Sequence, residues 1–263
     1  MTDRSTETQA LFQSERQRQI SALTRQHGRV EVAILADKFQ VTTETIRRDL
    51  SDLQRQKLVR RVHGGGVPWE NSVHEPLVAV RADRNDSEKR RLAHRAIEEL
   101  PERGSIIIDS GSTLTRFAEA IPDGHDLNVV TNSLPIAMAL AERDTIEVIV
   151  TGGALRKNTL ALVDSQAVEA ISPLAVDTLF ISSDAATPVT GLTTPYRQEA
   201  ALKRAMIDSA RRVVALIDHS KFAKDEFIRF AEWSDVDVLV TTTELDPTIA
   251  AAVEATGTTV VFA

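Results

Sequence analysis

Apolar residues in the first quarter of the chain recur at helical spacing in three short blocks, residues 15–26, 31–39 and 43–56. Spacings of three and four place them on one side of a helix, because an α-helix has 3.6 residues per turn. Only residues 40–42 separate the second block from the third, so the chain must turn sharply between them. The pattern predicts three short helices, the last two joined by a tight turn.

The third block has one apolar face and one basic face. Ile46, Leu50 and Leu53 fall at i, i+4 and i+7, whereas Arg47 and Arg48 point elsewhere. A helix with adjacent arginines in its N-terminal half suits entry into the major groove of DNA. An ordinary surface helix with solvated charges has the same local pattern, so the flanking segments decide between the two interpretations.

A β-hairpin is predicted directly after this helix, over residues 58–67. Arg60 and Arg61 can reach phosphates or the minor groove, and the glycines at 64–66 let the backbone turn or approach DNA closely. A flexible linker is the alternative interpretation of the glycine run. His63 is interpreted as a turn or surface residue rather than a metal ligand, because no second metal-binding residue type is nearby.

Charge is distributed unevenly along the chain. The net charge is −7, but residues 15–67 hold eleven Lys and Arg against six Asp and Glu, a net +5. Residues 1–14 carry −1, which leaves −11 for residues 68–263. We therefore expect only the basic segment to meet phosphate.

Composition excludes several classes of protein. The absence of cysteine excludes disulfides, thiolate metal sites and a cysteine nucleophile. No apolar run approaches the ~20 residues that a membrane helix needs, and no secretory signal pattern begins the chain. We expect a cytoplasmic protein with no membrane partner.

From residue 87 onward, short apolar runs alternate with amphipathic stretches. The predicted strands are residues 105–109, 127–131, 146–151, 178–182, 212–218, 236–241 and 258–262. The predicted helices are residues 87–100, 113–121, 134–141, 199–210 and 247–255. Apolar strands separated by helices indicate a parallel sheet covered on both faces, in which ligands bind beyond the carboxyl ends of the strands.

Small polar residues and glycine follow five of these strands. They are Asp109-Ser110-Gly111-Ser112-Thr113, Thr131-Asn132-Ser133, Thr151-Gly152-Gly153 with Arg156 and Lys157 beyond, Ser183-Asp184, and Asp218-His219-Ser220-Lys221. Free N–H groups and the dipole of a helix N-terminus bind anions. Helix caps use the same residue types, so each segment alone is weak evidence. Together they predict a pocket for a polyol phosphate.

Longer motifs resemble one family. The run L-A-D-K-F-x-V-T-x-E-T-I-R-R-D-L at 35–50, followed by R-R-V-H-G-G-G at 60–66, is similar to the winged helix-turn-helix of DeoR-family bacterial transcriptional regulators. The motifs I-I-I-D-S-G-S-T, V-V-T-N-S, T-G-G-A-L-R and L-I-D-H-S-K-F, and the segment 191–206, resemble that family's effector domain, in the same order. Departures from the family pattern occur at Lys57 and Gly66, in the helix-turn-helix part of the chain.

The resemblance implies an α/β fold in two parts. The first is an N-terminal winged helix-turn-helix domain, residues 15–67, after a flexible segment 1–14. The second is a Rossmann-like, ribose-5-phosphate-isomerase-like domain with a mainly parallel sheet, residues 87–263, beyond a linker at 68–86.

The resemblance also assigns roles to individual residues. The expected DNA-binding residues are Thr42, Thr43, Thr45, Arg47, Arg48, Arg60, Arg61 and His63. The expected effector-binding residues are Asp109, Ser110, Gly111, Ser112, Thr113, Thr131, Asn132, Gly152, Gly153, Arg156, Asp184, Glu199, Lys203 and Lys221. Ser182, Ala185 and Asp164 stand where the family commonly has glycine, which narrows the pocket or changes its ligand. Lys89 matches a lysine of the family pattern, but we interpret it as a residue on a solvated helix face.

Three functions compete at this point. The first is a regulator, in particular a repressor of sugar or related carbon metabolism genes, which binds double-stranded operator DNA under control of a phosphorylated sugar or polyol. The second is an isomerase-like enzyme in which Asp184, Glu199 and Lys221 act as acids and bases. The third is a structural DNA-associated oligomer. We favour the regulator, without catalytic residues, metal or cofactor, as a homodimer or homotetramer, because operators are usually read by paired heads.

Overall fold

The computed structural model describes residues 13–27, 30–56, 58–62, 64–68 and 85–263. The chain divides into two compact units, Met1–Pro76 and Leu77–Ala263, which we describe separately. Residues 1–12 of the predicted N-terminal segment and most of the predicted linker lie outside the described residues, as do His63 and Lys57. Gln13 and Ser14, predicted to be flexible, belong to the first helix.

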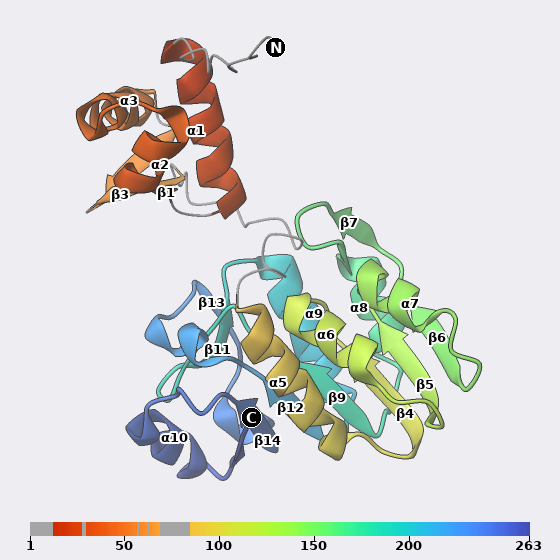
Figure 1. The fold of residues 1–263 in the computed structure, drawn as a ribbon. Helices are drawn as coiled ribbons and strands as arrows, with labels where there is room; N and C mark the ends of the chain where they lie inside the picture. The colour runs from red at the N-terminus through yellow and green to blue at the C-terminus, as the bar shows by residue number, and fades with distance from the viewer. Residues whose placement is uncertain (1–12, 28–29, 57, 63, 69–84) are drawn as a thin grey trace, which may run out of the picture. The chain divides into compact units, whose positions relative to one another are not determined.

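The described part of the first unit contains the predicted helices and hairpin (Figure 1). Its elements are α1 (Gln13–His27), β1 (Val30–Glu31), α2 (Val32–Phe39), α3 (Thr43–Arg55), β2 (Val59–Val62) and β3 (Gly65–Pro68). Thr42 caps α3, because its hydroxyl accepts a hydrogen bond from the Thr45 N–H at 3.2 Å. The apolar face of α3 is buried against Ile20 of α1 and Phe39 of α2, which confirms the predicted inner face.

The two-residue strand β1 is absent from the sequence prediction, because two residues show no alternation. It pairs antiparallel with β3, with Val30 opposite Gly66 and Glu31 opposite Gly65. A Cβ atom on Gly65 would lie 1.9 Å from the carbonyl oxygen of Val30, so only glycine allows this pairing. The linker interpretation of the glycine run is therefore wrong for Gly65 and Gly66, which lie in a sheet.

A buried ion pair fastens α3 to α1. Asp49 is 1% exposed, and its carboxylate accepts hydrogen bonds from Arg16 Nε at 2.6 Å and from Gln17 Nε2 at 3.0 Å. The carboxylate therefore holds an arginine of α1 and faces away from solvent. It contributes to the position of α3 rather than to the surface that α3 exposes.

The second unit is built on a seven-stranded parallel sheet with the strand order β15-β14-β12-β9-β4-β5-β6. The strands are β4 (Arg103–Ile108), β5 (Asp126–Thr131), β6 (Ile146–Val150), β9 (Thr178–Ile181), β12 (Val213–Leu216), β14 (Val238–Thr241) and β15 (Thr259–Phe262). All seven were predicted, and all adjacent pairs are parallel. None of the described helices is long and apolar enough to cross a membrane.

Helices cover both faces of this sheet (Figure 1). Ile106 and Ile108 of β4 lie in one core with α5 (Asp86–Ala96), α6 (Ser112–Ala120) and α7 (Leu134–Leu140). Ile107 faces the other core, which contains α8 (Ser165–Ile171), α9 (Arg197–Asp208) and α10 (Pro247–Glu254). The strand is apolar throughout because successive side chains enter different cores.

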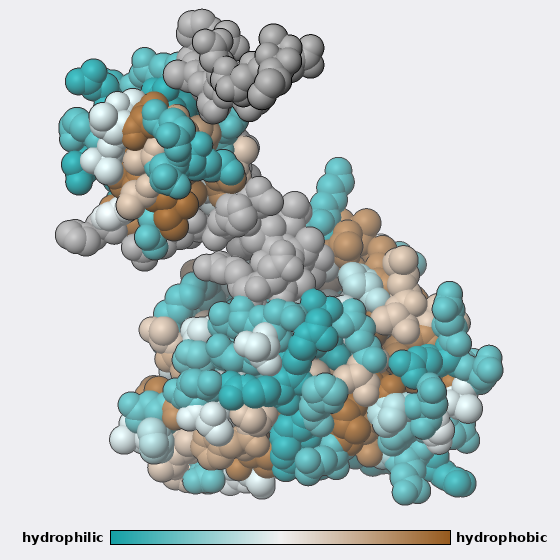
Figure 2. All heavy atoms as spheres, viewed as in Figure 1, coloured by the Kyte–Doolittle hydropathy of each residue, from teal (hydrophilic) through white to brown (hydrophobic). Residues whose placement is uncertain are grey.

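Several short elements of this unit were not predicted. They are β10 (Ala185–Thr187), β11 (Gly191–Thr194) and β13 (Ile228–Ala231), which form an antiparallel sheet, the hairpin β7 (Ala154–Arg156) and β8 (Ala161–Val163), the helix α8, and the 3-10 turns η1 (Ile97–Glu99), η2 (His219–Ala223) and η3 (Trp233–Asp235). These elements lie outside the alternation of strand and helix that marks the seven strands of the large sheet, so that sequence pattern does not predict them. Figure 2 shows a mostly hydrophilic surface with hydrophobic side chains exposed over β7 and α7.

We expect Asp49→Ala to reduce the free energy of unfolding of the first unit by about 3–5 kcal/mol, because it leaves the Arg16 charge buried without its carboxylate. Denaturant unfolding of the whole chain, followed by circular dichroism, measures this loss. Glu44→Ala is the matched control on α3, because Glu44 pairs at 3.3 Å with Arg47 and both side chains are more than half exposed. Equal losses for the two variants would show that the buried pair is not a major stabilising contact.

Candidate functional site

The surface of α3 and the β2–β3 hairpin contains the predicted DNA-binding residues that the structure describes. Arg47 and Arg48 on α3 and Arg60 and Arg61 on β2 are exposed. Arg47 Nη1 lies 3.3 Å from Glu44 Oε2, a pair of exposed side chains that solvent screens. The arginines of α3 are therefore accessible to a phosphate or a base edge.

A groove between α3 and the hairpin brings basic residues of both together. Arg47, Leu50, Arg61 and Gly64 are among its lining residues. The backbone N–H of Arg61 donates to Gln54 Oε1 at 2.9 Å, which fastens the hairpin to α3. Thr43 is exposed and Thr45 is half-buried beside the cap, with its hydroxyl 2.9 Å from that of Thr42.

In the second unit, a buried ion pair occupies the carboxyl edge of the sheet. Asp109, directly after β4, pairs with the ammonium group of Lys203 on α9. Lys203 Nζ also donates to the Ser182 carbonyl oxygen at 2.9 Å and lies 5.3 Å from the centroid of the Phe230 ring. Burial acts to lower the pKa of Lys203, but the carboxylates of Asp109 and Glu199 raise it above its ordinary value. Lys203 is thus a cation at neutral pH.

Glu199, one turn before Lys203, joins two further elements to this pair. Its carboxylate pairs with the guanidinium of Arg156 on β7. The Thr194 hydroxyl donates to Asp184 Oδ2 at 2.8 Å and lies 3.4 Å from Glu199 Oε2. Burial raises the pKa of Glu199; Lys203 acts to lower it and Asp184 to raise it. The structure therefore places three predicted carboxylates and two predicted cations in one connected network.

An aromatic ring supports one of those cations. The guanidinium carbon of Arg156 lies 3.8 Å from the centroid of the Tyr196 ring, which orients the arginine by a cation–π contact. Neither Tyr196 nor Thr194 was predicted as a site residue. Thr194 ends the short strand β11, and Tyr196 directly precedes α9; no periodic signal marks either position.

The N-terminus of α6 lies directly beyond Asp109. Gly111 has φ +132°, and a Cβ there would meet no atom within 4 Å, so the backbone conformation rather than space requires glycine. Ser112 and Thr113 are buried in the first turn, and Ser110 is half-buried before it. The first N–H groups of a helix have no acceptor within it, so this turn offers donors to an anion.

Residues at the ends of β5 and β6 also hold the local structure together. The Thr131 hydroxyl donates to the Ile108 carbonyl oxygen at 2.7 Å, and Asn132 Nδ2 donates to Leu162 O at 3.2 Å. Asn132 Oδ1 is buried and has no hydrogen-bond partner among the described residues, so it is an available acceptor. A Cβ on Gly153 would lie 2.6 Å from the Val163 carbonyl oxygen, so this glycine permits a close approach to β8.

Asp164, one of the departures from the family pattern, stabilises the loop that contains Gly152 and Gly153. It has φ +100°, a conformation that favours glycine. Its carboxylate accepts from the N–H groups of Ala154 at 3.0 Å and Gln166 at 2.9 Å, which offsets the backbone strain. The departure at Ser182 is also bonded locally, since its hydroxyl donates to Leu216 O at 2.8 Å. Ala185 is fully buried in β10.

Two lysines complete the candidate pocket residues. Lys221 is half-buried on η2, a turn capped by Asp218, whose Oδ1 accepts from the Ser220 N–H at 3.0 Å. Lys89 on α5 is 5% exposed, so the expectation of a solvated helix face is wrong for it. Its helix is amphipathic, and the lysine falls among the inner positions with Leu92 and Ala96.

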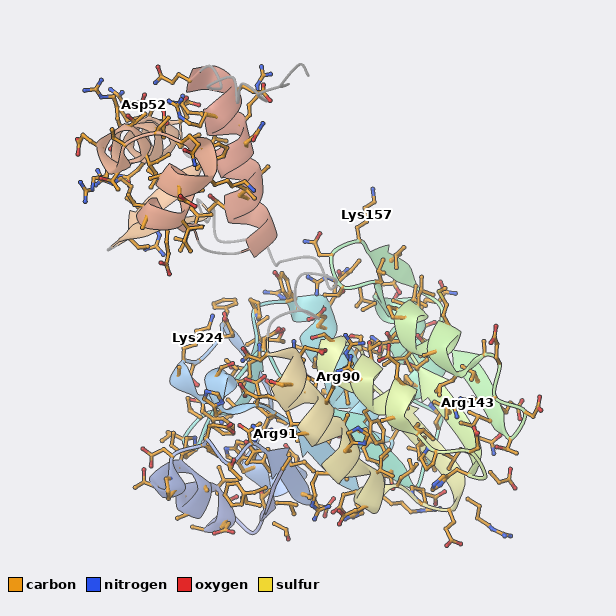
Figure 3. All side chains as sticks on the ribbon, viewed as in Figure 1. Asp52, Arg90, Arg91, Arg143, Lys157 and Lys224 are labelled. Carbon is orange, nitrogen blue, oxygen red and sulfur yellow. The ribbon has the colours of Figure 1, made fainter. Side chains whose placement is uncertain are left out.

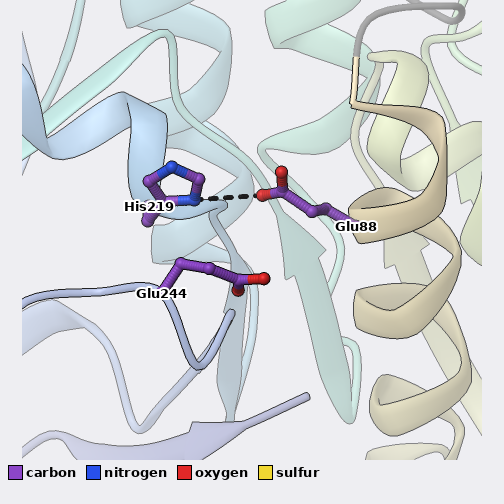
Figure 4. Close-up of side chains that lie close together, drawn as sticks. All are labelled: Glu88, His219 and Glu244. Atoms are coloured by element: carbon purple, nitrogen blue, oxygen red, sulfur yellow. Dashed lines mark hydrogen bonds and ion pairs between the residues drawn. The ribbon is translucent and has the colours of Figure 1, made fainter.

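Ligand-type atoms of Glu88, His219 and Glu244 lie within 4.8 Å of one another (Figure 4). His219 Nδ1 is 3.0 Å from Glu88 Oε2, and Arg91 Nη2 donates to both oxygens of Glu244 at 2.6 and 2.8 Å. Each of the three side chains thus has a protein partner. Figure 3 shows Arg91 on the outer side of α5. We interpret the cluster as contacts that hold α5 to the ends of β12 and β14.

Comparison with known proteins follows the same division into two units. The model of the DeoR-like helix-turn-helix domain matches residues 16–70, and the model of the DeoR C terminal sensor domain matches residues 84–243. The sensor match alone covers more than half of the chain. Both matches follow the order that the motifs predict.

The relatives that match over most of the chain are proteins named as regulators. The HTH-type transcriptional regulator GlpR of Haloferax volcanii is 36% identical over 251 residues, covering 95% of this chain and 98% of that protein. The glycerol-3-phosphate regulon repressor of Escherichia coli strain K12 is 31% identical over 229 residues, covering 87% and 90%.

Among solved structures, ribose 5 phosphate isomerase A from Neisseria gonorrhoeae has a TM-score of 0.38 and 21% identity over 52% of this chain and 53% of that chain, a likeness too distant to carry any inference. The family evidence excludes the enzyme alternative, because the matched family consists of regulators. The chain belongs to the DeoR family of transcriptional regulators.

Proposed function

We propose that this protein represses genes of sugar or polyol metabolism by binding operator DNA through α3. The observation that supports the DNA contact most directly is the groove that brings Arg47 of α3 and Arg61 of the hairpin together. Arginine binds guanine O6 and N7 or a phosphate, and the charge of +5 on residues 15–67 attracts the duplex. The name of the Escherichia coli relative supports repression as the direction of control.

The second part of the proposal is a small phosphorylated sugar or polyol as the effector. Its support is the buried network that ends at the N-terminus of α6. The free N–H groups there suit a phosphate, while Asp109, Asp184 and Glu199 offer carboxylate oxygens to sugar hydroxyl groups. Lys203 and Arg156 balance part of the carboxylate charge, so an anion can approach.

An effector controls DNA binding only if its affinity differs between two arrangements of the protein. We propose a cytoplasmic homodimer or homotetramer, because paired helix-turn-helix heads read two half-sites on one face of the duplex. The effector would then favour one placement of the paired heads over another.

We expect Arg47→Ala to weaken operator binding by about 1–3 kcal/mol, the loss of one arginine contact to a base. Fluorescence anisotropy with labelled operator DNA at fixed salt measures this change. Arg18→Ala is the matched control, since it removes the same charge from a side chain on α1 that is 83% exposed. An operator affinity unchanged by Arg47→Ala, or reduced equally by both variants, would contradict a groove contact for Arg47.

We expect one member of a panel of glycerol 3-phosphate, glucose 6-phosphate, fructose 6-phosphate and ribose 5-phosphate to raise the melting temperature and to change operator affinity. Ser110→Asp should then weaken the binding of that compound by at least tenfold, about 1.4 kcal/mol, because the new carboxylate competes for the N–H groups of α6. Isothermal titration calorimetry measures the affinity.

Thr248→Asp is the control for this charge change. It places the same charge in the first turn of α10, after β14, and two strands separate β14 from β4 in the sheet. A panel without any stabilising compound would overturn the effector proposal and leave the DNA-binding proposal standing.

A further inference from the structure

Exposed large apolar side chains of the second unit occur singly at Val189, Phe227 and Phe262, but four lie within residues 138–155. Met138 on α7 is 78% exposed, Ile149 and Val150 on β6 are 48% and 39% exposed, and Leu155 on β7 is 45% exposed. They belong to three neighbouring elements, since α7 contacts β6 and only residues 151–153 separate β6 from β7. Figure 2 shows hydrophobic side chains at the surface over α7 and β7. Because Ile149 and Val150 are successive residues of a strand, they lie on opposite faces of the sheet, so exposed apolar side chains flank β6 on both faces.

The same segment contains an open edge of the seven-stranded sheet. Within the described part of the chain, β6 pairs with β5 on one side only. The register places Ile149 beside Val130, which is 5% exposed, and Val150 beside Thr131, which is fully buried. The sequence I-E-V-I-V contains no lysine or proline, the residues that commonly protect an edge strand. Glu147 is the one charged residue of this strand, and the edge is otherwise apolar and suited to pairing with another strand.

The distribution of charge around β6 indicates which strand can pair with this edge. Acidic residues lie before and within the start of β6, at Glu142, Asp144 and Glu147, and Arg143 among them is paired with Asp123, whereas Lys157 follows the end of the strand. Figure 3 shows Lys157 extending away from the turn after β7. If a second copy of β6 pairs antiparallel, the acidic start of one strand lies beside the end of the other strand, which is the end that Lys157 follows. A parallel copy would place the two acidic starts together.

We propose that β6 pairs antiparallel with β6 of a second copy of this chain, about a two-fold axis at Val148. Such an interface is isologous, so one surface serves both copies and closes the assembly. Glu147 then lies opposite Ile149 of the second copy, and Met138 and Leu155 extend the apolar contact. The inference deepens the oligomer of the proposed function by naming its surface, but its test needs neither DNA nor effector.

The test compares one substitution on each outer strand of the sheet. Ile149→Asp on β6 places a carboxylate opposite Glu147 of the second copy, and Phe262→Asp alters β15, the other outer strand, at a side chain of similar exposure, 44%. Sedimentation equilibrium at micromolar concentration should show the wild-type mass halved by Ile149→Asp and unchanged by Phe262→Asp. Circular dichroism checks that both variants are folded.

Two further variants test the register. Glu147→Lys combined with Ile149→Asp should restore the wild-type mass, because opposite charges then face each other across the axis. The chain has no cysteine, so Val148→Cys supplies a single thiol that should link two copies under mild oxidation. A monomeric wild-type protein, a mass unaffected by Ile149→Asp, or a mass halved only by Phe262→Asp would overturn the proposal. A double variant that stays at half mass and a Val148→Cys variant that does not link would overturn the register.

Discussion

The buried pair of Asp109 and Lys203 is the contact on which the effector unit depends. Both side chains are almost completely buried, and a buried charge without its partner is strongly destabilising. The lysine must therefore keep α9 against the end of β4. Its hydrogen bond to the Ser182 carbonyl oxygen also holds the end of β9 to α9. Through Glu199 and Arg156 the same helix also holds β7. Charge neutralisation at the carboxyl edge of the sheet thus holds α9, β7 and the ends of β4 and β9 together.

Under the proposed function, the two units would bind anions by different physical means. The first carries a net +5, a field that attracts the DNA backbone over some distance and weakens with salt. The second belongs to the acidic remainder of the chain, so its overall field repels an anion. A phosphate there has to be bound by short-range donors, the N–H groups of α6 and the neighbouring cations, which act where solvent is excluded.

The helix α5 connects the pocket to the start of the second unit. It is the first described element after the predicted linker, and its N-terminal turn carries Asp86 and Glu88. Asp86 accepts from Arg116 of α6 at 2.8 Å, and Glu88 contacts His219 of η2 at 3.0 Å. A change at the N-terminus of α6 or at the end of β12 would therefore act directly on the helix that follows the linker.

The sequence by itself determined the helix-turn-helix, the hairpin and all seven parallel strands. Their apolar periods are long enough to be recognised, and the R-R-D-L and H-G-G-G motifs are specific to one family. It also identified the polar segments that follow the strands. These features are local, since a helix face, a strand or a cap is encoded within a few consecutive residues.

Only the tertiary structure decided which of those residues meet. Lys203 and Asp109 are 94 positions apart and Arg156 and Glu199 are 43 apart, so no local pattern encodes either pair. The pairing of β11, which carries Thr194, with β13 was missed for the same reason, because α9 and β12 lie between these two strands in the sequence. Burial likewise changed the role of Lys89 from a surface charge to an inner residue. Periodicity predicts which face of an element is buried, whereas long-range packing decides which charges share that buried space.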